Sequence, residues 1–173
     1  FVVDQALTCG SQMARFATIL TLLSLLLVSC GVGSIRCSSS TTTNHDNSTD
    51  MISLLDFKRA IINDSRQALR SWNGSVPLCN WEGVHCSSGR VTKMYLSERG
   101  LMGRISSSLG NLTFLRTLDL SKNGFTGELP PLNRLQRLKY LVLSDNSLIG
   151  EIPHDIGHLS NLVQLNLALN NLT

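Results

Sequence analysis

The sequence lacks the features that would point to catalysis or to nucleic-acid binding. Its 173 residues carry 15 Lys and Arg against 12 Asp and Glu, which is no footprint for a polyanion. No P-loop, kinase catalytic loop or G-x-S-x-G elbow is present, and a lone G-x-G at residues 31–33 lies in a region of small residues. The chain itself is therefore not expected to be an enzyme, and no cofactor is implied.

A long apolar run is also missing. The longest, residues 16–28, is shorter than the roughly 20 residues that a membrane-spanning helix needs. A basic start at Met13–Arg15 precedes it and small residues follow it, which is the layout of a secretory signal peptide. We predict a signal peptide over residues 13–37, cleaved between Cys30 and Ser40, with a retained signal anchor as the alternative. Residues 1–12 are predicted to be an upstream segment.

The next stretch favours a secreted glycoprotein. Residues 38–49 are polar and of low complexity, and we expect a disordered linker there. Sequons for N-glycosylation follow the signal peptide, at Asn47, Asn63, Asn73, Asn111 and Asn171.

The cysteines fit the same compartment. Cys79 and Cys86 lie seven residues apart around a Trp and a Gly, and in a secreted chain this predicts a short disulfide loop. Two buried thiols are the alternative. Cys9 and Cys30 fall in the N-terminal segment, and Cys37 is left without an assigned role.

What the sequence does have is a repeated phrase. The pattern L-x-x-L-x-L-x-x-N begins at Leu115, Leu138 and Leu162, and a looser copy begins at Val91. Equivalent positions 94, 118, 141 and 165 are 24, 23 and 24 residues apart. A repeat of this length indicates a solenoid, which presents an extended recognition surface rather than a catalytic cleft.

Each phrase is predicted to hold a short strand whose leucines point inward, and the strands are predicted to stack as a parallel sheet. Asn123, Asn146 and Asn170 close the phrases. Because an amide has both donors and acceptors, we expect a buried ladder that bonds the backbone of adjacent coils, with surface turn residues as the alternative. Arg99 replaces the asparagine in the first copy.

The full pattern L-x-x-L-x-L-x-x-N-x-L-x-G-x-I-P resembles the plant-type leucine-rich repeat over residues 90–173. The resemblance implies an α/β leucine-rich repeat solenoid of about four repeats. It places a parallel sheet on the concave face, with turns and 3₁₀ segments on the convex face. His154 and His158 are four residues apart, but Pro153 and Gly157 place them on a turn, with Ile152 and Ile156 pointing inward, so no metal site is expected.

Residues 50–89 are predicted to cap the first coil. Asp50 is the expected N-cap of a helix whose apolar stripe holds Leu54, Phe57 and Ile61, widened by Leu55 and Ile62. The order D-x-x-x-L-L-x-F-K, S-W-N and C-x-W-x-G-V-x-C resembles the N-terminal cap of plant leucine-rich repeat receptors.

Residues that alternate with the leucines define a candidate binding face. Its tyrosines, mixed with both charge signs, would suit a peptide or protein partner, although merely solvated sheet residues would show the same pattern. The candidate residues are Lys93, Tyr95, Glu98, Thr117, Asp119, Lys122, Tyr140, Val142, Asp145, Gln164 and Asn166.

The combined patterns resemble the N-terminal part of a plant receptor-like kinase ectodomain, closest to the branch of cell-surface immune receptors. That resemblance implies ligand recognition at the extracellular face of the plasma membrane, in immune or developmental signalling, with a co-receptor ectodomain as a further partner. A membrane span and a Ser/Thr kinase are then expected beyond residue 173, which makes this chain an N-terminal fragment. The alternatives are a secreted inhibitor or binding protein of an extracellular enzyme, and a non-functional truncated product.

Overall fold

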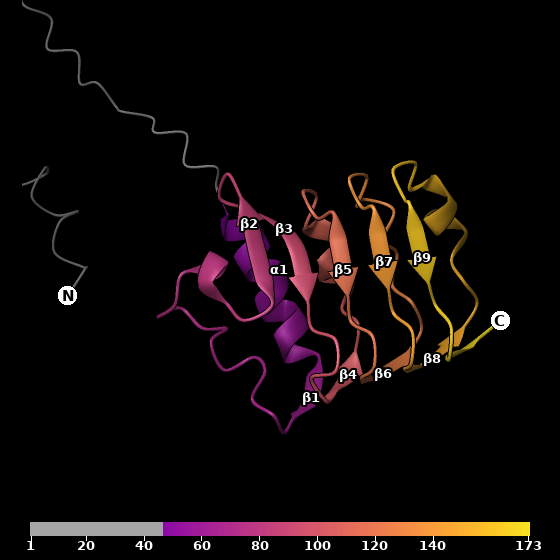
Figure 1. The fold of residues 1–173 in the computed structure, drawn as a ribbon, viewed down its shortest axis with the longest axis horizontal. Coiled ribbons are helices and arrows are strands. Elements are labelled where there is room, and N and C mark those ends of the chain that lie inside the picture. Colours follow the sequence, from indigo (N-terminus) through magenta and orange to yellow (C-terminus); the bar gives the residue numbers. More distant parts are fainter. Residues whose placement is uncertain (1–46) are drawn as a thin grey trace, which may run out of the picture. The chain divides into compact units, whose positions relative to one another are not determined.

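The computed structural model describes residues 47–173 as a stack of coils, each contributing one strand to each of two sheets (Figure 1). The predicted upstream segment, the signal peptide, Cys37 and most of the predicted linker lie outside the described residues.

The first sheet is the predicted one. Its strand order is β2-β3-β5-β7-β9, with β2 antiparallel to β3 and the others parallel. Met94, Leu118, Leu141 and Leu165 are paired in register, as the repeat period requires. The prediction of a parallel sheet is therefore confirmed. The strands are β2 (Val84–Ser87), β3 (Arg90–Tyr95), β5 (Thr117–Asp119), β7 (Tyr140–Val142) and β9 (Gln164–Asn166).

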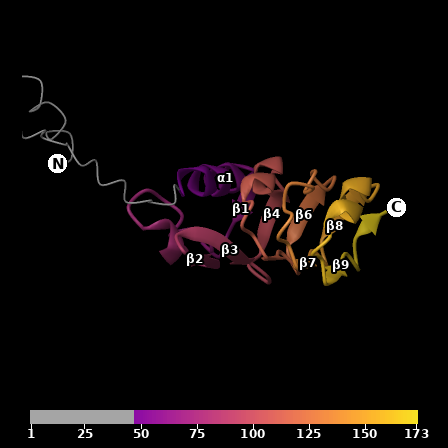
Figure 2. The same cartoon turned by 90° about the horizontal axis from the view of Figure 1, so that it is seen from above.

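A second sheet lies on the convex side of the coils, where only turns and 3₁₀ segments were expected. Figure 2 shows the two sheets as two layers. Leu101, Phe125 and Leu148 point into the interior from it, each 0% exposed. Gly103 has a φ of 146°, and a Cβ there would lie 2.3 Å from the carbonyl oxygen of Ala60, so the close pairing with β1 requires glycine. The strands are β1 (Ile61–Asp64), β4 (Leu101–Arg104), β6 (Gly124–Gly127), β8 (Ser147–Gly150) and β10 (Asn171–Leu172).

The expected 3₁₀ segments are η2 (Ser107–Asn111) and η3 (His154–His158). Ile156 of η3 is buried, but Ile152 is 44% exposed and does not point inward as predicted. Both histidines are exposed. Within residues 47–173, no three His, Cys, Asp or Glu side chains gather as a metal site would need, and no helix there has the length and hydropathy to cross a membrane.

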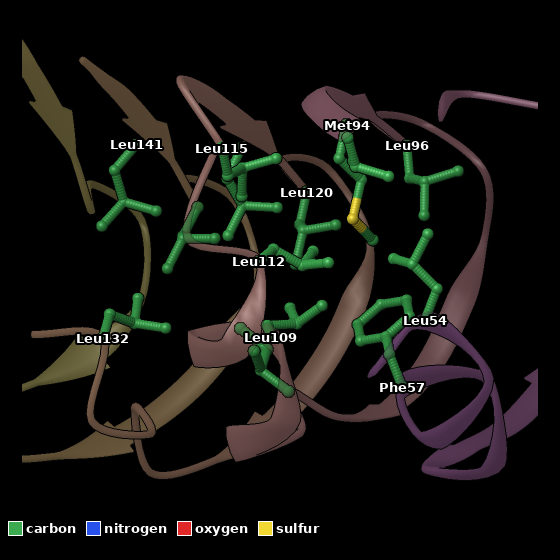
Figure 3. Packing of buried hydrophobic residues seen from close by; sticks show 14 of the residues in the cluster. Leu54, Phe57, Met94, Leu96, Leu109, Leu112, Leu115, Leu120, Leu132 and Leu141 are labelled. Carbon is green, nitrogen blue, oxygen red and sulfur yellow. The ribbon is translucent and has the colours of Figure 1, made fainter. Parts of the chain in front are cut away.

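The cap helix α1 (Ser48–Arg59) covers the first coil. Leu54 and Phe57 are 0% exposed and lie beside Met94 and Leu96 of the stack (Figure 3). The helix begins at Ser48, so it includes the last two residues of the predicted linker, and it ends at Arg59. Ile61 and Ile62 therefore do not belong to its stripe; they lie in β1, and Ile62 is 81% exposed, because pairing with β4 pulls this segment into the second sheet.

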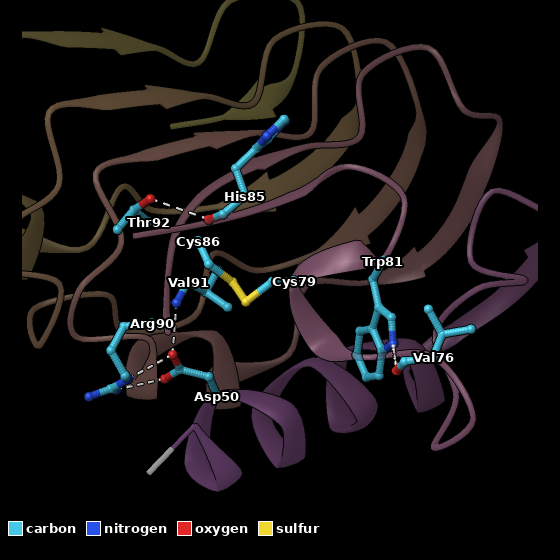
Figure 4. Close-up of a disulfide and its surroundings, with 9 residues drawn as sticks. All are labelled: Asp50, Val76, Cys79, Trp81, His85, Cys86, Arg90, Val91 and Thr92. Carbon is cyan, nitrogen blue, oxygen red and sulfur yellow. Dashed lines mark hydrogen bonds and ion pairs between the residues drawn. A yellow bond between two sulfur atoms is a disulfide. The ribbon is translucent and has the colours of Figure 1, made fainter. Parts of the chain in front are cut away.

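Asp50 does not cap the helix, contrary to the prediction, since its side chain points into the protein. Its carboxylate accepts hydrogen bonds from Arg90 Nε at 2.9 Å, Arg90 Nη2 at 2.7 Å and the Val91 backbone N–H at 2.9 Å (Figure 4). The Asp50 side chain is 0% exposed and that of Arg90 is 13% exposed. This buried ion pair joins α1 to the start of β3.

The predicted disulfide between Cys79 and Cys86 is present and joins η1 (Leu78–Asn80) to β2. Two tryptophans complete this part of the cap, with their rings stacked 5.3 Å apart. Trp72 Nε1 donates to Glu82 O and Trp81 Nε1 donates to Val76 O, each at 2.9 Å. The cap core is thus both apolar and satisfied in its hydrogen bonds.

The asparagines of the repeats bond to the backbone of their own and the preceding coil. Asn123 accepts from the backbone N–H groups of Arg99 and Leu101 and donates to the carbonyls of Leu96 and Leu120. Asn146 and Asn170 make similar bonds one and two coils further on: each accepts from one backbone N–H, of Phe125 or Leu148, and donates to carbonyls of its own and the preceding coil. Because Asn123 serves the first coil, Arg99 can occupy the asparagine position there; its guanidinium instead pairs with Glu82 at 2.7 Å.

Candidate ligand-binding face

The first sheet has one face in the core and one face in solvent, which we call the open face. Leu118 and Leu141 on the core side are 0% exposed. Tyr95 of β3 and Tyr140 of β7 are adjacent in sequence to inward residues, so their side chains lie on the open face, where they are 39% and 40% exposed. Half-buried tyrosines on a sheet offer rigid contact area together with a polar hydroxyl, which suits recognition of another molecule.

A shallow hollow of about 390 Å³ lies on the open face. Its lining includes seven of the candidate residues. It also includes two basic residues, Arg116 and Lys139, that were not among the candidates. They directly precede β5 and β7 and occupy equivalent positions in consecutive repeats, and this recurrence of a basic residue could have identified them from the sequence. The hollow is lined by Lys93, Tyr95, Arg116, Thr117, Asp119, Lys139, Tyr140, Val142 and Gln164.

The lining residues differ in what they can offer a ligand. Thr117 is only 7% exposed and adds little area. The Asp119 carboxylate already accepts hydrogen bonds from the backbone N–H and the hydroxyl of Ser121, at 3.0 and 2.7 Å. The two tyrosines and Val142 therefore supply most of the apolar contact area. Arg116 and Lys139 supply positive charge just before β5 and β7, and Lys93 supplies it from within β3.

Glu98, Lys122 and Asp145 do not line the hollow. They occupy turns after the strands, with positive φ values of 58°, 54° and 59°. Glu98 and Lys122 form an exposed ion pair between neighbouring coils. The hydrogen bond and charge of Lys122 hold the pKa of the Glu98 carboxyl below its usual range, and Glu98 raises the pKa of Lys122. Asn166 ends β9, and its side chain accepts from the Ala168 backbone N–H at 3.2 Å.

The fold and this face define a leucine-rich repeat protein with a disulfide-bonded cap. Two family descriptions match: "Leucine rich repeat N-terminal domain" at residues 47–87, and "Leucine Rich repeats (2 copies)" at residues 113–154. The first covers most of the predicted cap, and the second covers part of the predicted repeats.

Three similar proteins come from Arabidopsis. The LRR receptor-like serine/threonine-protein kinase EFR is 41% identical over 128 residues, which are 72% of this chain and 12% of that protein. The BIR2 ectodomain is 38% identical with a TM-score of 0.67, covering 71% of this chain and 68% of that one. The HAESA ectodomain, solved with an IDA peptide hormone ligand, is 34% identical with a TM-score of 0.64, covering 72% and 21%.

The chain therefore belongs to the plant leucine-rich repeat receptor-like kinase family, and the part of that family it matches is the extracellular ectodomain. It spans about a tenth of the length of the curated relatives that it matches.

Proposed function

We propose that this chain is an extracellular recognition module of a plant cell-surface receptor-like kinase, and that its open face binds a peptide or protein ligand. The observation that carries the proposal is the hollow, where two half-exposed tyrosines and Val142 lie beside three cationic side chains. Contact surfaces of this composition, aromatic at the centre and charged at the edge, are typical of protein recognition.

The related ectodomain of HAESA binds a peptide hormone, and we extend the same ligand class to this chain. A further similar structure is that of the BIR3–SERK2 complex from Arabidopsis, and a co-receptor ectodomain is the second partner that we propose for this chain. We place the chain in the secretory pathway and on the extracellular face of the plasma membrane, or in the apoplast. The disulfide supports this placement, since such bonds persist in oxidising compartments.

The sequons also support the open face as the ligand site. Asn47 precedes α1, Asn63 lies in β1, Asn73 in the cap, Asn111 at the end of η2 and Asn171 in β10. None of these five lies on a strand of the first sheet. Since an N-linked glycan is bulky and hydrophilic, glycans on these asparagines would leave the open face accessible.

We expect mass spectrometry of the chain secreted from plant cells to find N-glycans at these sequons. Replacing all five asparagines with glutamine should leave ligand binding at the open face unchanged within about twofold, because no glycan would have covered it. A secreted chain without glycans, or one whose peptide binding depends on them, would contradict this placement of the glycans.

The proposed ligand face can be tested with phage-displayed random peptides selected against the glycosylated chain. We expect selected peptides to lose at least about tenfold in affinity when Tyr140 is replaced by alanine, because buried aromatic contacts dominate such interfaces. The matched control is Ile149→Ala, which removes a half-exposed apolar side chain (51% exposed) from β8 in the second sheet.

Surface plasmon resonance measures the affinity of the selected peptides for both variants. Peptides that tolerate Tyr140→Ala but lose affinity with Ile149→Ala would place the ligand site on the second sheet and would overturn the proposal.

A further inference from the structure

A second, smaller pocket adjoins the hollow at the amino-terminal ends of β3, β5 and β7. Its volume is about 150 Å³, and its lining includes Arg90, Arg116 and Arg137, with Phe114 and the side chains of Ser87 and Ser88. This volume suits a single charged group rather than a sugar ring or a nucleotide. Arg116 lines both this pocket and the hollow, so one bound ligand can reach both.

The pocket has an excess of positive charge. The charge of Arg90 is balanced by the buried carboxylate of Asp50, through two hydrogen bonds. Among residues 47–173, those that line the pocket include no carboxylate, so the charges of Arg116 and Arg137 have no acidic counterpart within that lining. Both side chains are exposed, and they come from equivalent regions of consecutive repeats.

Phe114 holds part of this cluster in place. The Cζ atoms of Arg90 and Arg137 lie over its ring, 4.2 and 4.0 Å from the ring centroid. Such cation–π contacts use the face of the guanidinium group and leave its in-plane N–H donors available for hydrogen bonds. A guanidinium fixed in this way is suited to an oxyanion, because its paired donors match two oxygen atoms.

We propose that this pocket is an oxyanion site, in which Arg116 and Arg137 bind an acidic side chain of the peptide that occupies the hollow. Ser87 and Ser88, whose hydroxyl groups can donate hydrogen bonds, are also among its lining residues. The statement that the anion belongs to a peptide rests on the proposed function. The statement that the pocket binds an oxyanion rests on its lining residues alone. The ligand class is thus narrowed to peptides with an Asp or Glu next to an apolar segment.

The pocket can be tested without the natural ligand, with sulfate as the probe. Sulfate raises the unfolding temperature of proteins in general, because it is excluded from their surface, and an anion that binds only the folded state adds to that rise. The sulfate-over-chloride rise at equal ionic strength should therefore be larger for the wild-type full chain than for Arg116→Gln or Arg137→Gln. Arg70→Gln is the matched control, since Arg70 is exposed and lies in the cap outside the pocket.

Each variant is compared with itself in the two salts, so a change in basal stability does not affect the result. Arg116 is not stacked on Phe114, so its variant reports on anion binding without disturbing that ring contact. An equal sulfate response in wild type and all three variants, or no sulfate response in wild type, would overturn the oxyanion site.

The selected peptides distinguish this proposal from the proposed function. They should contain Asp or Glu, lose at least about tenfold in affinity with Arg116→Gln, and be displaced by sulfate. Peptides that require Tyr140 but ignore Arg116→Gln and sulfate would overturn the acidic-peptide assignment and leave the open face as the ligand site. Sulfate binding that depends on Arg116, with no peptide bound at the open face, would support the oxyanion site and count against the proposed function.

Discussion

Replacing Asp50 with alanine should lower the free energy of unfolding by about 3–5 kcal/mol, the usual cost of removing one partner of a buried ion pair. The Asp50 side chain is 0% exposed and Arg90 is 13% exposed, so little water is available to replace the lost carboxylate. The Val91 backbone N–H would lose its hydrogen bond to Asp50 as well. Because these three groups join α1 to β3, we expect the cap to loosen before the later coils do.

Urea unfolding followed by circular dichroism measures this effect. The control is Asp56→Ala in the same helix, which removes an exposed pair with Arg59 and should cost no more than about 1 kcal/mol. Adding Arg90→Met to Asp50→Ala should recover part of the lost stability, since it removes the unpaired charge. Equal stability of Asp50→Ala and Asp56→Ala would show that the buried pair does not hold the cap.

Replacing Asn146 with leucine should lower the free energy of unfolding by about 3 kcal/mol, since a buried backbone group without a partner costs about 1–3 kcal/mol. The Asn146 side chain accepts from Phe125 N and donates to the carbonyls of Leu120, Leu143 and Ser144. Leucine has the same branched arrangement of side-chain heavy atoms as asparagine but offers none of these bonds. The two flanking coils should separate at this point of the stack.

The unfolding temperature of Asn146→Leu is compared with that of Asn133→Leu, which makes the same change at an exposed residue between coils. The exposed substitution should shift stability by about 0.5 kcal/mol or less. If the two variants unfolded at the same temperature, the asparagine hydrogen bonds would not contribute to holding the coils together.

The leucine spacing predicted the first sheet well because its cause is local and repeated. Every inward leucine recurs after 23 or 24 residues, so the register of the strands follows from the period alone. The second sheet escaped prediction because its strands have only two to four residues and contain glycine or asparagine, types that are depleted in strands. Their pairing depends on the stacking of the coils rather than on local propensity.

The cap shows a different limit. A sequence window around Asp50 contains a plausible helix start, and the N-cap interpretation follows from that window. Its partner Arg90 lies 40 residues further on, and nothing local indicates that the two meet. In contrast, Cys79 and Cys86 lie seven residues apart, and their pairing was predicted.

For the candidate site, alternation along the strands identified the tyrosines and Val142, because a strand presents every second side chain to the same face. It also included Glu98, Lys122 and Asp145, which lie in left-handed turns beyond the strands. Arg116 and Lys139 were missed because they stand one position before the strands, where strict alternation would place them on the core side with Leu118 and Leu141.

The most direct test of the account is a glycan placed on the open face. Val142→Asn completes a sequon with Ser144, and Arg104→Asn on β4 of the second sheet completes a matched one with Ser106. With occupancy verified by mass spectrometry, we measure the affinity of the selected peptides for each secreted variant. We expect the glycan from Val142→Asn to abolish binding and the one from Arg104→Asn to leave it unchanged. Undiminished binding to an occupied Val142→Asn variant would contradict the assignment of the open face as the ligand site.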